Sequence, residues 1–308
     1  MKKSITERLG GLPALLISMM IWGSVGIFRQ CINAFSSGMI AFSRGFVGML
    51  FLLLVMLIGK KRPDVQAWRK NLIPLCVSGT FLGANWILLF ESYNAALPGH
   101  TSVTVATICY YMAPVIVTLL APFVLKERLT VKKVICMAVA FGGVILVTVF
   151  SGSGEAAEGS QLVGILLALG AAALYALIVL LNKKMRDISA LDRTVAQLGI
   201  SAVVMLPYAL LTEPILPQFF GWEDVTCLAV VCLLHTGVAY ALYFGTIGRL
   251  QAQTAALCSY IDPVEAIILS AVFLGENVGV WGIVGAVLVI GAALVGELRF
   301  SRFKGKAE

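Results

Sequence analysis

Three carboxylic acids lie within one strongly apolar segment, SYIDPVEAIILSAVFLGE at residues 259–276. Asp262 and Glu265 are three residues apart, so on a helix their side chains share one face. A charge at the centre of a membrane helix costs about 2.5–3.5 kcal/mol on insertion scales, so such a group faces a cavity or a partner. The pair therefore indicates a site for a proton, a cation or an amino group. The alternative is a structural ion pair, for example with Arg44.

The same segment contains a proline, Pro263, which has a counterpart at Pro114 in an earlier apolar segment. Proline has no backbone N–H, so in a helix it leaves the carbonyl group four residues earlier without its usual partner. These carbonyl groups belong to Ser259 and Tyr110. Free carbonyl groups at matching depths could line a binding site. Kinks that serve only helix packing are the alternative.

Arg44 lies well inside another apolar segment, MIAFSRGFVGML at residues 39–50. Its guanidinium keeps its charge at any accessible pH, so it requires an acidic partner inside the membrane. The candidates for that partner are a carboxylate of the substrate or the side chain of Glu91, Asp262 or Glu265. A structural role and a substrate-binding role both stay open for Arg44.

Further polar and aromatic residues fall near the middle of apolar segments, away from the membrane interfaces where aromatic side chains usually lie. Aromatic rings at this depth can stack on a cationic or aromatic substrate, and a histidine can carry a proton near neutral pH. Ordinary packing between helices is the alternative for each. These candidate substrate-binding residues are Trp22, Asn85, Trp86, Tyr110, Tyr111, His235 and Tyr260.

The composition identifies the elements that must position these residues. The 308 residues are 59% hydrophobic and only 13% charged, whereas soluble proteins are about 25% charged. Apolar stretches of about 20 residues, the length that crosses a bilayer as a helix, recur along the chain. The sequence therefore predicts an all-α polytopic membrane protein in a cell membrane, most simply the bacterial cytoplasmic membrane. Its ten predicted spans are residues 11–30, 37–59, 71–94, 100–125, 131–150, 161–182, 190–212, 222–247, 252–275 and 279–298.

The basic residues predict how these spans are oriented. With the N-terminus in the cytoplasm, 21 of the 23 Lys and Arg residues fall in cytoplasmic segments. Such a bias follows the positive-inside rule and predicts that both termini are cytoplasmic. The net charge of +7 is therefore explained by topology, and we expect no nucleic-acid partner. The seven cysteines show no metal-ligand spacing, so neither a metal nor a cofactor is predicted.

The chain repeats itself. YYMAPVIVTLLAPFVLKERLTV (110–131) and SYIDPVEAIILSAVFLGENVGV (259–280) match at a constant offset of 149 residues. The matches are Tyr111/Tyr260, Pro114/Pro263, Val115/Val264, Leu120/Leu269, Leu125/Leu274, Glu127/Glu276 and Val131/Val280. Two halves of five spans, at 11–150 and 161–298, would enter the membrane from opposite sides, with 299–308 as a basic cytoplasmic tail. Such an inverted-topology repeat is typical of secondary transporters.

The order of these features resembles the drug/metabolite transporter superfamily, in its ten-helix EamA-type branch. The features are Trp22-Gly23-Ser24 in the first span, Arg44 in the second, and the two P-V…L-x-E motifs that end the fourth and ninth spans. The resemblance implies a secondary transporter that exports small metabolites by alternating access, with proton coupling in some members. It also implies a cavity formed by the first four helices of each half. Asp262 and Glu265 replace the Ala113 and Ile116 of the first half, so the two half-sites are chemically unequal.

Charge within the membrane favours one substrate class. An acid at Asp262 suits an amino group and a cation at Arg44 suits a carboxylate, so we expect amino acids or amines. The alternative within transport is a nucleotide-sugar carrier, against which the scarcity of buried Lys and Arg argues.

The sequence contains no G-x-S-G, H-E-x-x-H or Walker A motif, which argues against an intramembrane enzyme and against ATP-driven transport. No pore-loop pattern indicates a channel. Either a monomer or a homodimer is compatible with the sequence.

Overall fold

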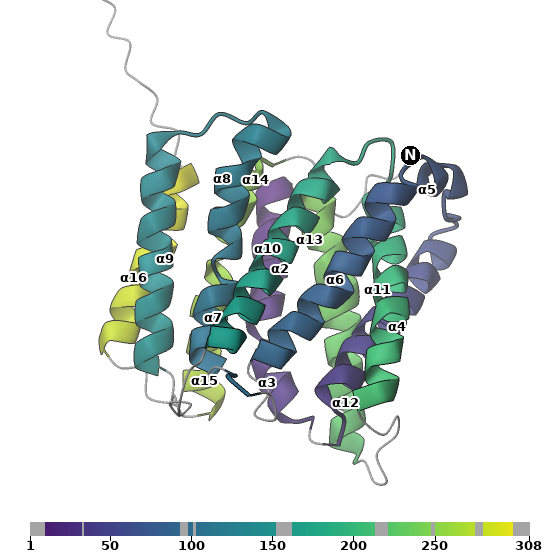
Figure 1. The fold of residues 1–308 in the computed structure, drawn as a ribbon, viewed down its shortest axis with the longest axis horizontal. Helices are drawn as coiled ribbons and strands as arrows, with labels where there is room; N and C mark the ends of the chain where they lie inside the picture. Colours follow the sequence, from purple (N-terminus) through teal and green to yellow (C-terminus); the bar gives the residue numbers. More distant parts are fainter. Residues whose placement is uncertain are drawn as a thin grey trace, which may run out of the picture.

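A computed structural model describes residues 10–32, 34–92, 98–100, 103–151, 162–212, 221–247, 250–274 and 280–297. In these ranges all regular secondary structure is helical, and the helices run side by side in a bundle (Figure 1). The first half of the chain forms α2 (Gly11–Gly23), α3 (Val25–Gln30), α4 (Ser37–Ile58), α5 (Val65–Lys70), α6 (Leu72–Ser92), α7 (Val103–Tyr110), α8 (Ala113–Leu125) and α9 (Val131–Ser151).

The second half continues the bundle and contains a π-helix, η1. It forms α10 (Leu162–Lys184), α11 (Ala190–Thr212), α12 (Trp222–Val230), η1 (Val231–Val238), α13 (Ala239–Ile247), α14 (Ala252–Cys258), α15 (Ile261–Leu274) and α16 (Val280–Glu297). Each predicted span therefore coincides with one helix or with two or three consecutive helices. Glu276 lies outside the described residues.

Among the described residues, six helical stretches are long and apolar enough to cross a membrane. They are residues 38–58, 72–92, 108–125, 162–184, 190–211 and 222–246, and two shorter apolar helices cover 11–23 and 280–296. This pattern is that of a polytopic membrane protein. The count of ten spans, the inverted repeat and the orientation stay predictions. We use "predicted cytoplasmic end" for the end of the bundle that carries α5 and the α8–α9 connection, which is the upper end in Figure 1.

Small residues let the long helices approach one another closely. A Cβ atom built on Gly79 of α6 would lie 2.7 Å from the Cβ atom of Ile200 on α11, so α6 and α11 pack closely because Gly79 has no side chain. On α10, three alanines spaced four residues apart, Ala168, Ala172 and Ala176, are fully buried. These close contacts form a rigid wall from α4, α6, α10 and α11.

The helices α9 and α16 pack against each other at one edge of the bundle (Figure 1). The broken helices α7–α8 and α14–α15 lie between this edge pair and the wall. The polar residues of α15 are thus held inside the bundle. The position of α9 and α16 at the edge is the one that the family resemblance implies for the last helix of each predicted half.

Candidate functional site

Both proline-containing spans are interrupted near their middle. A turn at residues 111–112 separates α7 from α8, and a turn at residues 259–260 separates α14 from α15. Pro114 and Pro263 each lie in the first turn of the helix that follows, where a missing N–H costs no intrahelical hydrogen bond. The helices therefore end at or beside Tyr110 and Ser259, whose carbonyl groups were expected to lack a helical hydrogen-bond partner.

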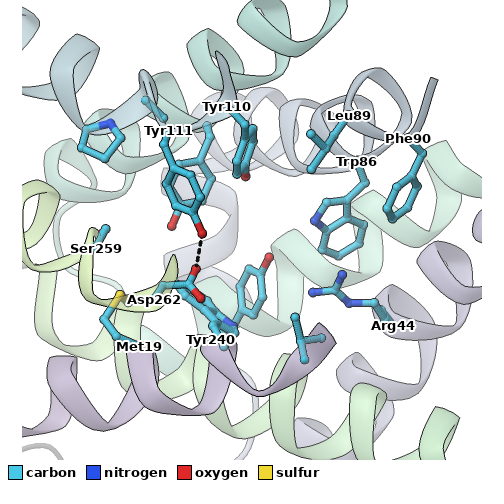
Figure 2. Close-up of a pocket in the computed structure, with 15 residues that line it drawn as sticks. Met19, Arg44, Trp86, Leu89, Phe90, Tyr110, Tyr111, Tyr240, Ser259 and Asp262 are labelled. Carbon is cyan, nitrogen blue, oxygen red and sulfur yellow. Dashed lines mark hydrogen bonds between the residues drawn. The ribbon is translucent and has the colours of Figure 1, made fainter. Parts of the chain in front are cut away.

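A cavity of about 180 Å³ lies where these interruptions meet the other helices of the bundle (Figure 2). Seven residues singled out from the sequence line it, namely Trp22, Arg44, Trp86, Tyr110, Tyr111, Pro114 and Asp262. The other lining residues are Met19, Val25, Leu89, Phe90, Ala113, Tyr175, Tyr240 and Ser259. Both halves of the chain contribute, so the cavity lies between them. Leu89 and Phe90 come from the last turns of α6, so the cavity extends away from the predicted cytoplasmic end.

Asp262 provides the negative charge of the cavity. Its Oδ2 atom accepts a hydrogen bond of 3.2 Å from the Tyr111 hydroxyl, the dashed line in Figure 2. Tyr111 is held in turn by its backbone, because its carbonyl oxygen accepts a hydrogen bond of 3.0 Å from the hydroxyl of the fully buried Tyr260. Tyr260 therefore lies behind the cavity and positions a residue that lines it.

Arg44 provides the positive charge. Its guanidinium carbon lies 4.9 Å from the ring centroid of Trp86, within the range of a cation–π interaction. Its Nε atom donates a hydrogen bond of 3.0 Å to the Thr236 hydroxyl. Within the described ranges no carboxylate forms an ion pair with Arg44. Glu91, one of the expected partners, instead accepts a hydrogen bond from the Tyr208 hydroxyl.

Aromatic rings form the wall between these two charged groups. In Figure 2, Tyr240 lies between Asp262 and Arg44. The Tyr240 ring contacts Trp22 edge-on, with centroids 5.1 Å apart, and lies 6.3 Å from Trp86. Such a surface presents apolar faces between an anionic and a cationic group, which suits a small molecule with both charges and an apolar part.

Two of the predicted residues support the cavity from behind. Asn85 is fully buried, and its side-chain Nδ2 atom donates a hydrogen bond of 2.6 Å to the carbonyl oxygen of Ala171. Its Oδ1 atom lies 3.4 Å from the Tyr110 hydroxyl. His235 is also fully buried, and its backbone carbonyl accepts a hydrogen bond of 2.8 Å from the indole N–H of Trp22. Asn85 and His235 thus orient Tyr110 and Trp22, which line the cavity.

Glu265 does not line the cavity either. It packs against the junction of α2 and α3, where a Cβ atom on Gly23 would lie 2.8 Å from the Cβ atom of Glu265 and 3.0 Å from the backbone oxygen of Asp262. Its Oε2 atom is buried and has no hydrogen-bond partner among the described residues. Pro263 is buried and lies outside the lining as well. The two acids of the D-P-V-E segment therefore occupy different environments.

Sequence reasoning missed Tyr240 and Thr236, because it had no means to recognise η1. A π-helix has wider turns than an α-helix, is rare, and is frequently found at functional sites. In η1 the Thr236 hydroxyl bonds to the carbonyl oxygen of Val231, five residues earlier, while it accepts a hydrogen bond from Arg44. Tyr240 follows in the first turn of α13. The only sequence signal was one more tyrosine in mid-span.

Polar contacts join three helices at the predicted cytoplasmic end of the bundle. Glu127, at the end of α8, forms an ion pair of 2.6 Å with Lys183 at the end of α10. Both carboxylate oxygens of Glu127 also accept the backbone N–H of Ala252, at 3.1 Å each, where α14 begins. Lys183 donates in addition to the carbonyl oxygen of Leu250. These contacts join the ends of α8, α10 and α14.

Comparison with known proteins identifies related sequences along nearly the whole chain. A sequence model of the EamA-like transporter family matches residues 9–149 and again residues 162–296. An uncharacterized transporter of Bacillus subtilis, YxxF, is 30% identical over 300 residues, which is 95% of this chain and 90% of that protein.

More distant relatives extend the comparison. Protein PecM of Dickeya dadantii is 26% identical over 245 residues, covering 79% of this chain and 78% of that one. A crystal structure of a protein with 14% sequence identity superposes with a TM-score of 0.80 and covers 92% of this chain and 95% of its own. At that identity the likeness concerns the fold alone.

Proposed function

Because this chain belongs to the EamA-like transporter family, we propose that it exports amino acids or amines by alternating access around the cavity described above. The family and its relatives are transporters. The chain is therefore a multi-pass protein of the bacterial cell membrane that transports small solutes, and it is not an enzyme. The substrate class, the direction and the coupling are our proposal.

The observation that carries the proposal is the placement of Asp262 and Arg44 on either side of one aromatic cavity. An α-amino acid carries an ammonium and a carboxylate, so it can satisfy both groups at once. Arg44 has no carboxylate partner in the described part of the chain, and an unpaired charge inside a membrane protein is costly. A substrate carboxylate supplies the missing partner, with Trp86 and Tyr240 against the apolar part.

The size of the cavity supports a small substrate. A volume of about 180 Å³ equals that of about six water molecules in the liquid. It is below the range of about 300–1,000 Å³ that is usual for drug-sized ligands. A nucleotide sugar is the less favoured alternative, since Arg44 is the one cation among the described lining residues and phosphates need several.

Alternating access is supported by the contacts at the predicted cytoplasmic end and by the turns that interrupt two spans. Glu127, Lys183 and the N–H of Ala252 join three helices at the predicted cytoplasmic end, and the cavity extends toward the opposite end. The turns at residues 111–112 and 259–260 provide interruptions at which the two halves of each broken span can tilt separately. In our proposal, these contacts separate when the cavity opens to the cytoplasm, and Asp262 exchanges a proton for the amino group.

The test uses purified protein in liposomes that contain a pH-sensitive dye. Amino acids, their decarboxylated amines, sugars and nucleotide sugars are added one at a time to the parent chain, Asp262→Asn and Arg44→Gln. For an amino acid substrate, we expect proton movement with amino acids, which both variants lose. For an amine substrate, Arg44→Gln keeps the activity and Asp262→Asn loses it.

The controls separate binding from coupling. Isotope flux is measured in the same liposomes, and Phe46→Leu, a change on a side chain of α4 that is exposed on the bundle surface, serves as the matched control. If isotope flux occurs without proton movement and continues in Asp262→Asn, transport is not coupled to protons through Asp262. Transport of a nucleotide sugar, with no response to amino acids or amines, contradicts the proposed substrate class.

A further inference from the structure

A second cavity lies apart from the transport site, between α4, α6 and α11 and beneath α5. Its volume is about 300 Å³, and every residue that lines it is apolar. Its lining includes Leu53 of α4, Leu75 of α6 and Ala196 of α11, and Trp68 of α5 lines it at the predicted cytoplasmic end. Figure 1 shows α5 at that end of α6. We call this cavity the α5 groove.

Trp68 is fixed in place at the head of the groove. Its indole N–H donates a hydrogen bond of 3.1 Å to the backbone carbonyl oxygen of Asp192, at the start of α11. Tryptophan at the membrane interface typically lies at the level of the lipid headgroups. Because α5 lies at the predicted cytoplasmic end, we expect Trp68 to lie at headgroup depth, and the groove continues from it along α4 and α11.

A cluster of exposed cations lies on and just before α5, the helix whose Trp68 lines the groove. The segment from the end of α4 to the end of α5 contains five exposed basic side chains, Lys60, Lys61, Arg62, Arg69 and Lys70. No ion pair involves any of them within the described ranges. None of these side chains has a role in the proposed transport mechanism.

Two carboxylates of this region, Asp64 and Asp192, are occupied by backbone and hydroxyl donors. Asp64 caps α5 by accepting a hydrogen bond of 2.9 Å from the N–H of Ala67. Asp192 is buried and accepts hydrogen bonds from the N–H of Asp64 and from the hydroxyl of Ser189. Neither of these two carboxylates forms an ion pair with the basic cluster, which lies on and just before α5 beside the apolar groove.

We propose that the α5 groove binds one anionic phospholipid of the cytoplasmic leaflet, with an acyl chain in the groove and its phosphate against the basic cluster. Clusters of four to eight Lys or Arg residues just cytoplasmic of a membrane helix attract anionic lipids. The positive-inside rule accounts for the cations alone, but it does not account for an entirely apolar groove beneath them. The combination of headgroup charge and chain-binding groove matches a phospholipid. This site goes beyond the proposed transport function and is independent of it.

Native mass spectrometry of the purified full-length chain tests the site. The chain is incubated with phosphatidylglycerol or with phosphatidylcholine of the same acyl chains, and separately with inorganic phosphate. We expect one phosphatidylglycerol to remain bound at collision energies that remove phosphatidylcholine, and no retention of phosphate. Equal retention of the two lipids contradicts the proposal, and retention of phosphate alone identifies an anion site without a role for the groove.

Two variants address the two parts of the site. Arg69→Gln/Lys70→Gln removes two cations. Because each cation contributes about fivefold in affinity, we expect this variant to bind phosphatidylglycerol at least tenfold more weakly. Ala196→Phe fills the groove, keeps the cluster and is expected to lose the lipid as well. The matched control is Lys126→Gln/Arg128→Gln, which removes two exposed cations from the same end of the bundle. Circular dichroism confirms that each variant is folded. If phosphatidylglycerol binds as tightly to Arg69→Gln/Lys70→Gln or to Ala196→Phe as to the parent chain, the proposed lipid site is wrong.

Discussion

The hydroxyl of Tyr260 donates a hydrogen bond of 3.0 Å to the backbone carbonyl oxygen of Tyr111, and these two tyrosines are 149 residues apart. This separation is the offset at which the two proline-containing segments match in sequence. Each tyrosine lies in the turn that interrupts its own span. The two interruptions are thus joined directly by a bond between equivalent positions, next to Asp262.

Replacing Tyr260 by phenylalanine tests this connection. The change leaves the Tyr111 carbonyl without its buried donor, which costs about 1–3 kcal/mol. We expect a lower unfolding temperature and a several-fold lower transport rate, because Tyr111 also donates to Asp262. The measurements are thermal unfolding and initial uptake rates in liposomes. A variant with unchanged rate and stability would show that the bond does not position Tyr111.

The cation–π contact between Arg44 and Trp86 predicts a graded effect on substrate affinity. Trp86→Leu removes the aromatic face that orients the guanidinium, whereas Trp86→Phe keeps a weaker one. A contact of about 1–2 kcal/mol corresponds to a KM for amino acids that is about five- to thirtyfold higher in Trp86→Leu, with Trp86→Phe between this variant and the parent. Concentration dependence of isotope uptake gives both values. Equal KM values in all three chains would contradict a role of Trp86 in orienting Arg44.

The contacts of Glu127 predict how the cavity is closed toward the cytoplasm. Glu127→Gln weakens both the ion pair with Lys183 and the bonds to the Ala252 N–H. We expect this variant to favour the state that is open to the cytoplasm. The probe is a Ser259→Cys side chain in the cavity, in a chain whose other exposed cysteines are replaced by serine. An impermeant thiol reagent applied from the cytoplasmic side should label it faster in Glu127→Gln.

A charge reversal provides the control for this experiment. Glu127→Lys combined with Lys183→Glu restores an ion pair but not the bonds to the N–H of Ala252. Labelling that returns to the parent rate would assign the closure to the ion pair. Labelling that stays fast would assign it to the backbone contact. Identical labelling of the parent and Glu127→Gln would overturn the proposed closure.

The close packing at Gly23 predicts that a larger residue there would clash at the junction of α2 and α3. An added methyl group would meet the Cβ atom of Glu265 at 2.8 Å, so Gly23→Ala must separate α2 from α15, at a cost of about 1–3 kcal/mol. The matched control is Gly142→Ala on α9, where nothing lies within 4 Å of the added Cβ atom. The control is expected to raise stability by about 0.5–1 kcal/mol. Thermal unfolding and uptake rates distinguish the two variants, and equal behaviour would contradict tight packing at Gly23.

Local sequence patterns predicted the elements well, because span length and proline position are local properties. Residues 111–112 and 259–260 interrupt their helices next to Pro114 and Pro263, as the missing N–H groups require. Asp262 lines the cavity because a carboxylate in an apolar segment needs a polar environment. These features follow from a few neighbouring residues each.

Contacts between distant spans could not be read from the same patterns. The sequence predicted a carboxylate partner for Arg44, but the partners that the structure provides are Trp86 and Thr236, which depend on how α4 packs on α6 and η1. Arg193, which no sequence pattern singled out, is buried and donates to the carbonyl oxygens of Asn182 and Phe244. Pairings of this kind depend on the register between helices, which no single segment encodes.

The π-helical turns of η1 also affect how this span tolerates changes in length. Deleting one residue from an α-helix rotates everything beyond it by about 100°, which would turn Tyr240 away from the cavity. A π-helix can take up the loss of a residue by tightening into α-helical turns. Residues 231–238 therefore form a stretch in which a one-residue deletion could leave α12 and α13 facing their present neighbours. Natural relatives that differ in length in this span would be expected to carry the gap there.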